Sequence, residues 1–200
     1  RSLHSVVLLD DGRVLIAGGD ENNGGNESAE VYNPTTNTFM LVENLEVQAR
    51  AAAKLRDGRV LMIGDFVAPI AFVFEPDTNS FAPVGDMNNM HAVFPTATAL
   101  PDGRVLVAGG CSRDAFATDK TDIFDPDTDT FSNGPTMTVN RDRHVAMLLP
   151  DGLVLLIGGM DNGEFHANGD LFDPSDNTIT RMSTQMSTSR VDFAGVALIP

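Results

Sequence analysis

Short apolar runs of four or five residues, separated by glycine, proline, asparagine and aspartate, recur along the whole chain. Near the start, Ser5–Leu9 is followed by Asp11 and Gly12, and then by Val14–Ala17. Runs this short, rich in β-branched residues and bounded by turn-forming residues, predict strands and not helices. Glycine tolerates the positive φ that a tight hairpin turn requires. We therefore predict an antiparallel hairpin at the start of the chain.

The residues after this hairpin predict two further strands. A polar loop follows the glycine pair at 18–19, and a third strand is expected at about residues 28–32. Pro34 ends that strand, because proline has no N–H to donate to a central ladder. The segment from Pro34 then predicts a turn into a fourth strand that contains Phe39. The whole unit is expected to be an antiparallel four-stranded meander.

This unit repeats along the chain. The block Asp-Gly-Arg-Val-Leu starts at Asp11, Asp57 and Asp102, and Asp-Gly-Leu-Val-Leu starts at Asp151, in steps of 46, 45 and 49 residues. A proline precedes an aromatic residue or isoleucine by five residues in each unit: Pro34 and Phe39, Pro76 and Phe81, Pro126 and Phe131, Pro174 and Ile179. Periods of this length are typical of units that stack on their neighbours to bury a shared core.

Two further features recur in phase with the turns. Glycine pairs close the second strand at 18–19, 109–110 and 158–159, and Gly64-Asp65 departs from this pattern. An aromatic residue is on each third strand, namely Tyr32, Phe74, Phe124 and Phe172. The pattern resembles the kelch repeat, and its Asp-Gly-Arg-Val-Leu form is similar to bacterial kelch proteins and to the propeller domain of galactose oxidase. The resemblance implies an all-β, kelch-type β-propeller.

The repeats predict four four-stranded antiparallel blades plus one extra strand. We expect a single propeller domain or fragment with repeats at about 1–46, 47–91, 92–140 and 141–189, and the start of a fifth at 190–200. The extra strand, Phe193 to Ile199, has no place in a closed four-blade ring. A larger propeller is therefore expected. The alternatives are a five-blade ring completed by another chain, or a four-blade ring in which this strand replaces the segment at Arg1.

Composition excludes several classes of function. The apolar content of 42% is sufficient for a core, and the formal net charge of −15 opposes binding to nucleic acid. No run of about 18 apolar residues is present, so we expect no membrane insertion. Asp125, Asp127 and Asp129 begin like a calcium loop, but Thr130 replaces the glycine that such a loop needs, so we predict a hairpin turn. We predict no metal ligands and no cofactor, and we expect a bacterial secreted or cell-surface protein.

Because successive strands of a meander run in opposite directions, the short turns that join strands one and two, and strands three and four, lie at the same end of each blade. The loops joining strands two and three, and each blade to the next, lie at the other end, where binding residues are expected. The candidate ligand-binding residues there are Arg1, His4, Arg50, Asp65, Arg113, Asp114, Arg143, His144, Asp161, His166 and Arg190. His4, Arg50 and His144 share a register seven residues before an Asp-Gly turn. They are predicted either to point toward the central axis, holding a carboxylate or a sugar, or to bond to neighbouring blades.

We predict a non-catalytic recognition module that binds protein or carbohydrate. One alternative is the propeller part of a galactose-oxidase-like copper oxidoreductase, whose site needs tyrosine and histidine ligands and a tyrosine crosslinked to cysteine. The chain has a single tyrosine, Tyr32, at a third-strand position, so these residues alone do not assemble that site. The other alternative is a structural or oligomerising array, in which Phe193 to Ile199 pairs with another subunit. The propeller is expected to be completed by further sequence or by another chain.

Overall fold

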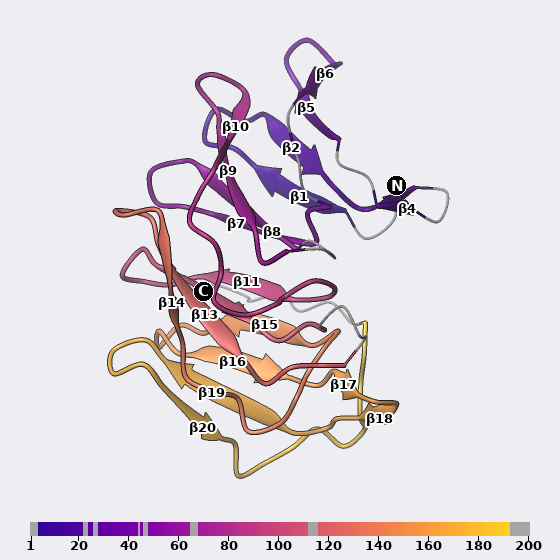
Figure 1. The fold of residues 1–200 in the computed structure, drawn as a ribbon, viewed down its shortest axis with the longest axis vertical. Helices are drawn as coiled ribbons and strands as arrows, with labels where there is room; N and C mark the ends of the chain where they lie inside the picture. Colours follow the sequence, from indigo (N-terminus) through magenta and orange to yellow (C-terminus); the bar gives the residue numbers. More distant parts are fainter. Residues whose placement is uncertain are drawn as a thin grey trace.

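The computed structural model describes residues 4–21, 24–25, 28–43, 45, 48–64, 68–111 and 116–192. Over these residues all regular structure is β, in four four-stranded sheets and two small hairpins. The four large sheets follow one another in chain order (Figure 1). We number them blade 1 to blade 4. No helix in the described part of the chain is long and apolar enough to cross a membrane.

Each blade is an antiparallel meander, as the repeat predicts. Blade 1 contains β1 (Ser5–Leu8), β2 (Val14–Ala17), β5 (Ala29–Asn33) and β6 (Thr38–Val42). The other blades have the same order: β7 (Ala51–Lys54), β8 (Val60–Ile63), β9 (Ala71–Glu75) and β10 (Ser80–Pro83); β11 (Thr96–Ala99), β12 (Val105–Ala108), β13 (Thr121–Asp125) and β14 (Thr130–Asn133); β15 (Val145–Leu148), β16 (Val154–Ile157), β19 (Gly169–Asp173) and β20 (Thr178–Arg181).

The connection between the second and third strands is itself folded in two blades. β3 (Asp20–Glu21) pairs with β4 (Gly24–Gly25) in blade 1, and β17 (Met160–Asp161) pairs with β18 (Glu164–Phe165) in blade 4. The sequence predicted polar loops here, and the structure extends them into two-residue hairpins beyond the end of the sheet.

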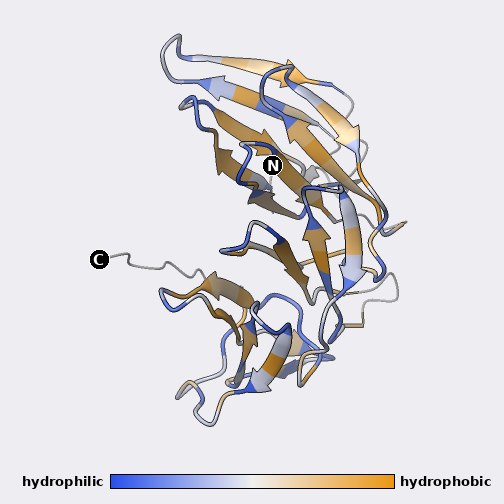
Figure 2. Cartoon of the chain, turned by 90° about the vertical axis from the view of Figure 1, so that its left-hand side faces the viewer, coloured by the Kyte–Doolittle hydropathy of each residue, from blue (hydrophilic) through white to orange (hydrophobic). Residues whose placement is uncertain are grey.

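The blades are arranged radially. Their first strands, β1, β7, β11 and β15, contact one another in succession, so these strands form the inner side. The sheets follow an open arc (Figure 2), as expected of part of a larger propeller. The predicted extra strand, Phe193 to Ile199, lies outside the described residues.

The core lies between consecutive blades. Leu15 and Val31 of blade 1 cluster with Met62 and Phe74 of blade 2, and the same kind of cluster recurs at the next two junctions. The central strands β8 and β12 are buried at every position, because both faces of their sheets are covered. Burying a side chain the size of Phe74 contributes about 1.5–3 kcal/mol. These apolar junctions, and not the hairpins themselves, therefore hold the arc together.

A polar contact repeats beside each apolar junction, at the end with the short turns. In blade 1, Asp11 accepts hydrogen bonds from the backbone N and Nε of Arg13, which holds the guanidinium in place. Arg13 Nη2 then donates to the Pro76 carbonyl (2.8 Å), and Nη1 donates to Asn79 Oδ1 (2.5 Å), both in blade 2. Asn79 has a φ of 51°, in the left-handed region that asparagine tolerates better than most residues.

We call this contact the turn latch. Arg59 of blade 2 makes it with Pro126 and Asp129 of blade 3, and Arg104 of blade 3 makes it with Pro174 and Asn177 of blade 4. The motif Asp-Gly-Arg is thus both a hairpin turn and a clamp on the next blade. Asp129, at the end of the calcium-like sequence, is a latch acceptor in a hairpin turn, as its sequence predicts.

Candidate functional site

The predicted ligand-binding residues divide into three groups in the structure. Arg1, Asp65, Arg113 and Asp114 lie outside the described residues. His4 is exposed just before β1, and Arg50 lies before β7, where its Nη2 donates to Gln48 Oε1 (3.3 Å). The remaining five, Arg143, His144, Asp161, His166 and Arg190, all belong to blade 4 and the segment after it.

Three of these five residues, Asp161, His166 and Arg190, are linked by hydrogen bonds at the loop end of blade 4. Asn140 Nδ2 donates to Asp161 Oδ2 (3.1 Å), and the Asn140 carbonyl lies 3.1 Å from His166 Nε2. The Arg190 N–H donates to the His166 carbonyl (3.3 Å). The hairpin of β17 and β18 is therefore joined to the segments that enter and leave blade 4.

Arg143 is a partly exposed cation of this region. Its guanidinium lies over the ring of Phe94, 3.8 Å from the centroid, and its Nη1 donates to Asp192 Oδ2 (2.9 Å). Phe94 and Arg143 each stand two residues before the first strand of their blade, β11 and β15. The side chains of Phe94, Arg143 and Asp192 therefore form a row. Phe94 belongs to blade 3, Arg143 to blade 4 and Asp192 to the segment after blade 4.

The backbone of this row is strained. Phe94, Arg143 and Asp192 have φ values of 58°, 51° and 51°. A bulky residue such as phenylalanine seldom adopts the left-handed region, because Cβ approaches the carbonyl oxygen. Strain of this kind collects at functional sites and persists only where the surroundings enforce it. The sequence did not predict Phe94 or Asp192 as site residues. One signal for Phe94 was present, because Phe94 and Arg143 both stand eight residues before an Asp-Gly turn.

Carboxylates surround the row. Asp142 Oδ1 and Asp161 Oδ1 are buried, and neither has a hydrogen-bond partner among the described residues. Burial raises the pKa of Asp142 above its usual range; the nearby Arg143 opposes the rise, and Asp192 and Asp161 add to it. The row thus combines the guanidinium of Arg143 and the ring of Phe94 with the carboxylate of Asp192, and Asp142 and Asp161 lie nearby.

His144 has a different environment from Arg143, its neighbour in the chain. It is buried, and its Nε2 lies 3.0 Å from Thr96 Oγ1 on β11 of blade 3. Burial, with the positive charge of Arg141 and the proximity of His91, lowers the pKa of His144 to about 3. The imidazole is therefore neutral near pH 7, and its visible contact is with a neighbouring blade.

Two buried side chains, His91 and Arg141, anchor the segments that lead into blades 3 and 4. His91 Nδ1 lies 2.6 Å from the Gly109 carbonyl, and Arg141 Nη1 donates to the Gly158 carbonyl (2.8 Å). Each of these side chains also faces a buried carboxylate, Asp122 at 3.3 Å for His91 and Asp170 at 3.6 Å for Arg141. The carbonyls they reach belong to the first glycine of each pair, so these contacts are structural.

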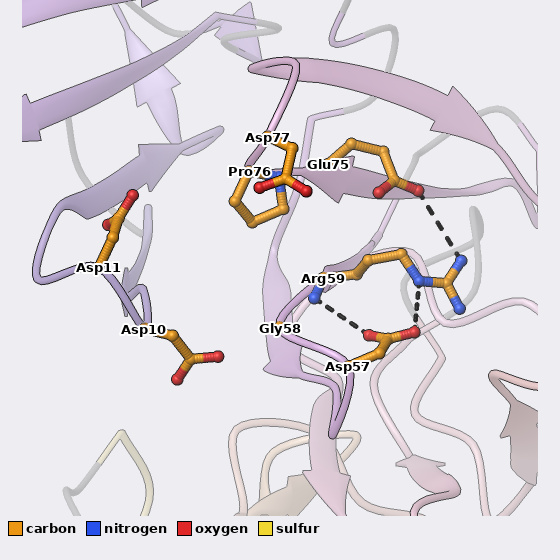
Figure 3. Close-up of a pocket in the computed structure, with 8 residues that line it drawn as sticks. All are labelled: Asp10, Asp11, Asp57, Gly58, Arg59, Glu75, Pro76 and Asp77. Atoms are coloured by element: carbon orange, nitrogen blue, oxygen red, sulfur yellow. Dashed lines mark hydrogen bonds and ion pairs between the residues drawn. The ribbon is translucent and has the colours of Figure 1, made fainter.

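A cleft lies at the opposite, turn end, between blades 1 and 2 (Figure 3). Its lining residues are Asp10, Asp11, Asp57, Gly58, Arg59, Glu75, Pro76 and Asp77. At the next junction, Arg56 crosses the corresponding cleft and binds both carboxylate oxygens of Asp127, at 2.5 and 2.6 Å. In the cleft of Figure 3 Asp10 stands at the position of Arg56, and it pairs with Lys54 of blade 2. No group of three His, Cys, Asp or Glu side chains in the described part is placed to hold a metal ion.

Four meanders stacked radially, with their first strands innermost, define a β-propeller. The family model described as "Kelch motif" matches residues 1–46 and 94–138. The chain is a kelch-repeat protein, and its four sheets are blades of a kelch-type β-propeller.

Similar proteins include both enzymes and kelch proteins of another kind. A galactose oxidase of Gibberella zeae is 33% identical over 149 residues, which is 68% of this chain and 21% of that protein. The F-box/kelch-repeat protein SKIP20 of Arabidopsis thaliana is 28% identical over 167 residues, covering 74% of this chain and 40% of that protein.

A solved structure supports the fold. It is titled a novel fungal alcohol oxidase with catalytic diversity among the AA5 family, in complex with copper, and it matches with a TM-score of 0.76 at 20% identity. The match covers 95% of this chain and 45% of that one. The chain thus spans less than half the length of each of these relatives.

Proposed function

We propose that the loop end of these blades binds a protein or carbohydrate ligand without catalysing a reaction, through the second-to-third-strand loops and the blade-to-blade segments. The observation that carries this proposal is the row of Phe94, Arg143 and Asp192, which three successive segments hold in left-handed conformations.

The row is suited to binding because its polar groups are both fixed and accessible. The side chain of Arg143 is 34% exposed and that of Asp192 is 53% exposed. A guanidinium carries five N–H donors, and the ion pair with Asp192 engages one of its nitrogen atoms. The remaining donors and the carboxylate can meet hydroxyl or amide groups of a ligand, beside the aromatic edge of Phe94.

Local charge limits the ligand class. The chain as a whole carries a formal charge of −15, and within the row the carboxylate of Asp192 pairs with the guanidinium of Arg143. Negatively charged polymers are therefore disfavoured. Neutral sugars, or protein segments with hydroxyl, amide or cationic groups, fit the site better.

The test is a binding screen of the chain on a panel of neutral oligosaccharides and a panel of peptides, followed by titration of every hit. Replacing Arg143 with Ala is expected to weaken binding at least tenfold while the circular dichroism spectrum stays unchanged. Arg181→Ala removes an exposed arginine from the outer strand β20 and is the matched control, with affinity expected to stay within twofold. Equal affinity of the Arg143→Ala variant and the parent chain would exclude this site.

The second candidate function is the propeller part of a copper oxidoreductase, which the similarity to galactose oxidase favours. The described residues do not fit a tyrosine-ligated copper site. Tyr32 lies in blade 1 with its hydroxyl bonded to Asn37 Oδ1 (3.0 Å) near the turn end, away from the Arg143 row. We therefore derive no step through copper. Metal analysis of the longest natural polypeptide after copper loading, with an alcohol-oxidation assay, separates this candidate from the first.

A further inference from the structure

The cleft at the turn end between blades 1 and 2 is acidic. Five of its lining residues carry carboxylates and one carries a guanidinium: Asp10, Asp11, Asp57, Glu75, Asp77 and Arg59. Asp11 lies on one side of the cleft and Asp57 on the other, with Asp77 between them (Figure 3). Pockets that hold whole small molecules have volumes of about 300–1,000 Å³. This cleft, at about 210 Å³, has a size suited to a single side chain.

The next junction has the same cleft, and a guanidinium crosses it. Every lining residue of this second cleft stands at a repeat position that also lines the first. Arg56 Nη2 donates to both carboxylate oxygens of Asp127, at 2.5 and 2.6 Å, and its Nη1 donates to the Asp102 carbonyl (3.2 Å). The second cleft therefore shows which chemical group this arrangement of residues binds.

The first cleft keeps the acceptors of the second and lacks its guanidinium. Asp77 stands at the repeat position of Asp127, and Asp10 stands at that of Arg56. The two replaced residues also occupy the same place in space. A Cβ atom on Gly58 would lie 3.0 Å from Asp10 Oδ2, and one on Gly103 would lie 2.7 Å from Arg56 Cδ. Each side chain thus reaches the glycine of the next blade's turn, but only arginine can donate to the carboxylate there.

The cations near the first cleft are engaged elsewhere. Arg13 and Arg59 are held in turn latches, and Lys54 pairs with Asp10. Asp77 is exposed, and no side chain in the described part of the chain bonds to it. The carboxylates of the cleft still outnumber the cations when Arg13 and Lys54 are included. A surplus of one sign of charge in a cleft attracts a group of the opposite sign.

The third junction shows that joining two blades does not require this carboxylate. There Pro101 stands at the place of Arg56, and Ser175 stands at the place of Asp127. The Ser175 hydroxyl bonds within its own turn. Blades 3 and 4 are nevertheless joined by an apolar cluster and a turn latch. Asp77 is therefore available to a partner without a cost to the junction.

We propose that the cleft between blades 1 and 2 binds an arginine side chain of a partner polypeptide. Its guanidinium takes the place that Arg56 takes at the next junction, donating to the Asp77 carboxylate and to the Asp57 carbonyl. Arginine is favoured over lysine because its planar fork reaches two acceptors at once. One exposed ion pair contributes little, so the partner segment is expected to carry further basic residues beside the arginine. The site lies at the end of the blades opposite the Arg143 row, and it is independent of the function proposed there.

The first test measures the fluorescence anisotropy of a labelled peptide titrated with the protein at low ionic strength. The peptide has arginine at its centre, glycine on each side and lysine at both ends. A second peptide has lysine at its centre, so both carry the same charge. The arginine peptide is expected to bind about fivefold more tightly. Equal affinity for the two peptides would overturn the assignment of the cleft to a guanidinium.

The second test removes the acceptor. Asp77→Asn is expected to weaken binding of the arginine peptide about fivefold, because the carboxylate charge is lost. Asp86→Asn is the matched control. It removes the same charge from an exposed residue in the segment after β10, at the other end of blade 2, and is expected to leave the affinity within about twofold. An equal loss in both variants would assign the binding to overall charge and overturn the proposal.

The third test fills the cleft from within. Asp10→Arg combined with Lys54→Ala copies the pair Arg56 and Ala99 of the next junction and changes the net charge by one unit, as Asp77→Asn does. The chain's own arginine is then expected to occupy the cleft and to weaken binding of the arginine peptide about fivefold. An unchanged circular dichroism spectrum checks the fold of the variant. Full binding by this folded variant would place the peptide elsewhere and overturn the proposal.

Discussion

At the turn end, one repeat position holds Arg13, Arg59 and Arg104, and all three make the same contacts with the next blade. At the loop end, one repeat position holds Phe94 in blade 3 and Arg143 in blade 4, which contact each other. The two ends are built on the same strands, yet the turn-end position repeats its side-chain contact from blade to blade, and the position of Phe94 and Arg143 does not.

The difference teaches how structure and recognition are divided in this molecule. A turn latch forms at each of the three described junctions, where it joins one blade to the next, and so its residues recur in blades 1 to 3. The position of Phe94 and Arg143 makes no such repeated contact, and its side chains are free to differ. Residues that vary at one position in successive blades are therefore better candidates for binding than residues that recur.

The largest expected effect comes from a buried cation of the loop end, Arg141. Replacing it with Ala leaves Asp170 buried without its charged partner and the Gly158 carbonyl without its donor. Loss of one partner of a buried pair costs about 3–5 kcal/mol. Urea unfolding measures this change, with Lys120→Ala as an exposed control. A loss below about 1 kcal/mol would show that this anchor is not structural.

His144 predicts a pH effect at the same end. Its pKa is lowered to about 3 in the folded chain from an ordinary value of 6.5, so the unfolded chain binds the proton first as the pH falls. Its contribution to stability is complete above pH 6.5 and is lost as the pH falls toward 3, by about 1.4 kcal/mol per pH unit. Between pH 6.5 and 5 this amounts to about 2 kcal/mol.

His144→Gln keeps a polar side chain near Thr96 and removes the titration. The stability of this variant is expected to fall less steeply between pH 6.5 and 5 than that of the parent chain. Unfolding free energies measured in urea at several pH values test this prediction. Parallel curves for the two proteins would contradict it.

Breaking a turn latch is expected to have a smaller effect on stability. Arg59→Ala removes the hydrogen bonds to the Pro126 carbonyl and to Asp129, and the expected loss is about 1–2 kcal/mol. Arg59→Lys is expected to recover only part of this loss, because an ammonium lacks the fork that reaches both acceptors. Thermal unfolding of the two variants checks this ranking, and full recovery by lysine would reduce the latch to simple charge attraction.

The smallest effect on stability is expected for Arg143→Ala. The exposed ion pair with Asp192 and the stack on Phe94 together contribute less than about 1 kcal/mol. The comparison of Arg59 with Arg143 thereby separates two arginines by function. A stability loss in Arg143→Ala as large as that of Arg59→Ala would remove the distinction between the two ends.

Sequence periodicity predicted the four meanders, because the hairpin turns and the third-strand aromatics are local signals. The Asp-Gly-Arg block was recognised as a hairpin turn, but its contact with the next blade was not predicted. Arg59 bonds to residues about 70 positions away in the next blade, and no local pattern indicates such a contact. The shared register of His4 and His144 was visible as well. The burial of His144 was not, because it depends on packing against Thr96 of the preceding blade, which is 48 residues away in the sequence.

The row at the loop end was only partly predictable. Arg143 and Asp161 were expected at a binding surface from strand parity and polarity. Phe94 and Asp192 were not, because a left-handed conformation in a residue other than glycine has no reliable sequence signal. The small hairpins of β3–β4 and β17–β18 were likewise read as loops, since strands of two residues carry no periodicity.

The turn latch has a direction. Its donor always belongs to one blade and its acceptors to the blade that follows, so the contact is heterologous and a row of blades has a head and a tail. Units joined head to tail either close into a ring or continue as a filament, and the rotation per unit decides which. The angle between successive sheets therefore decides whether the row of blades closes. Only in a closed ring does each blade have a neighbour on both sides, so that a latch arginine and its acceptors can meet at each junction.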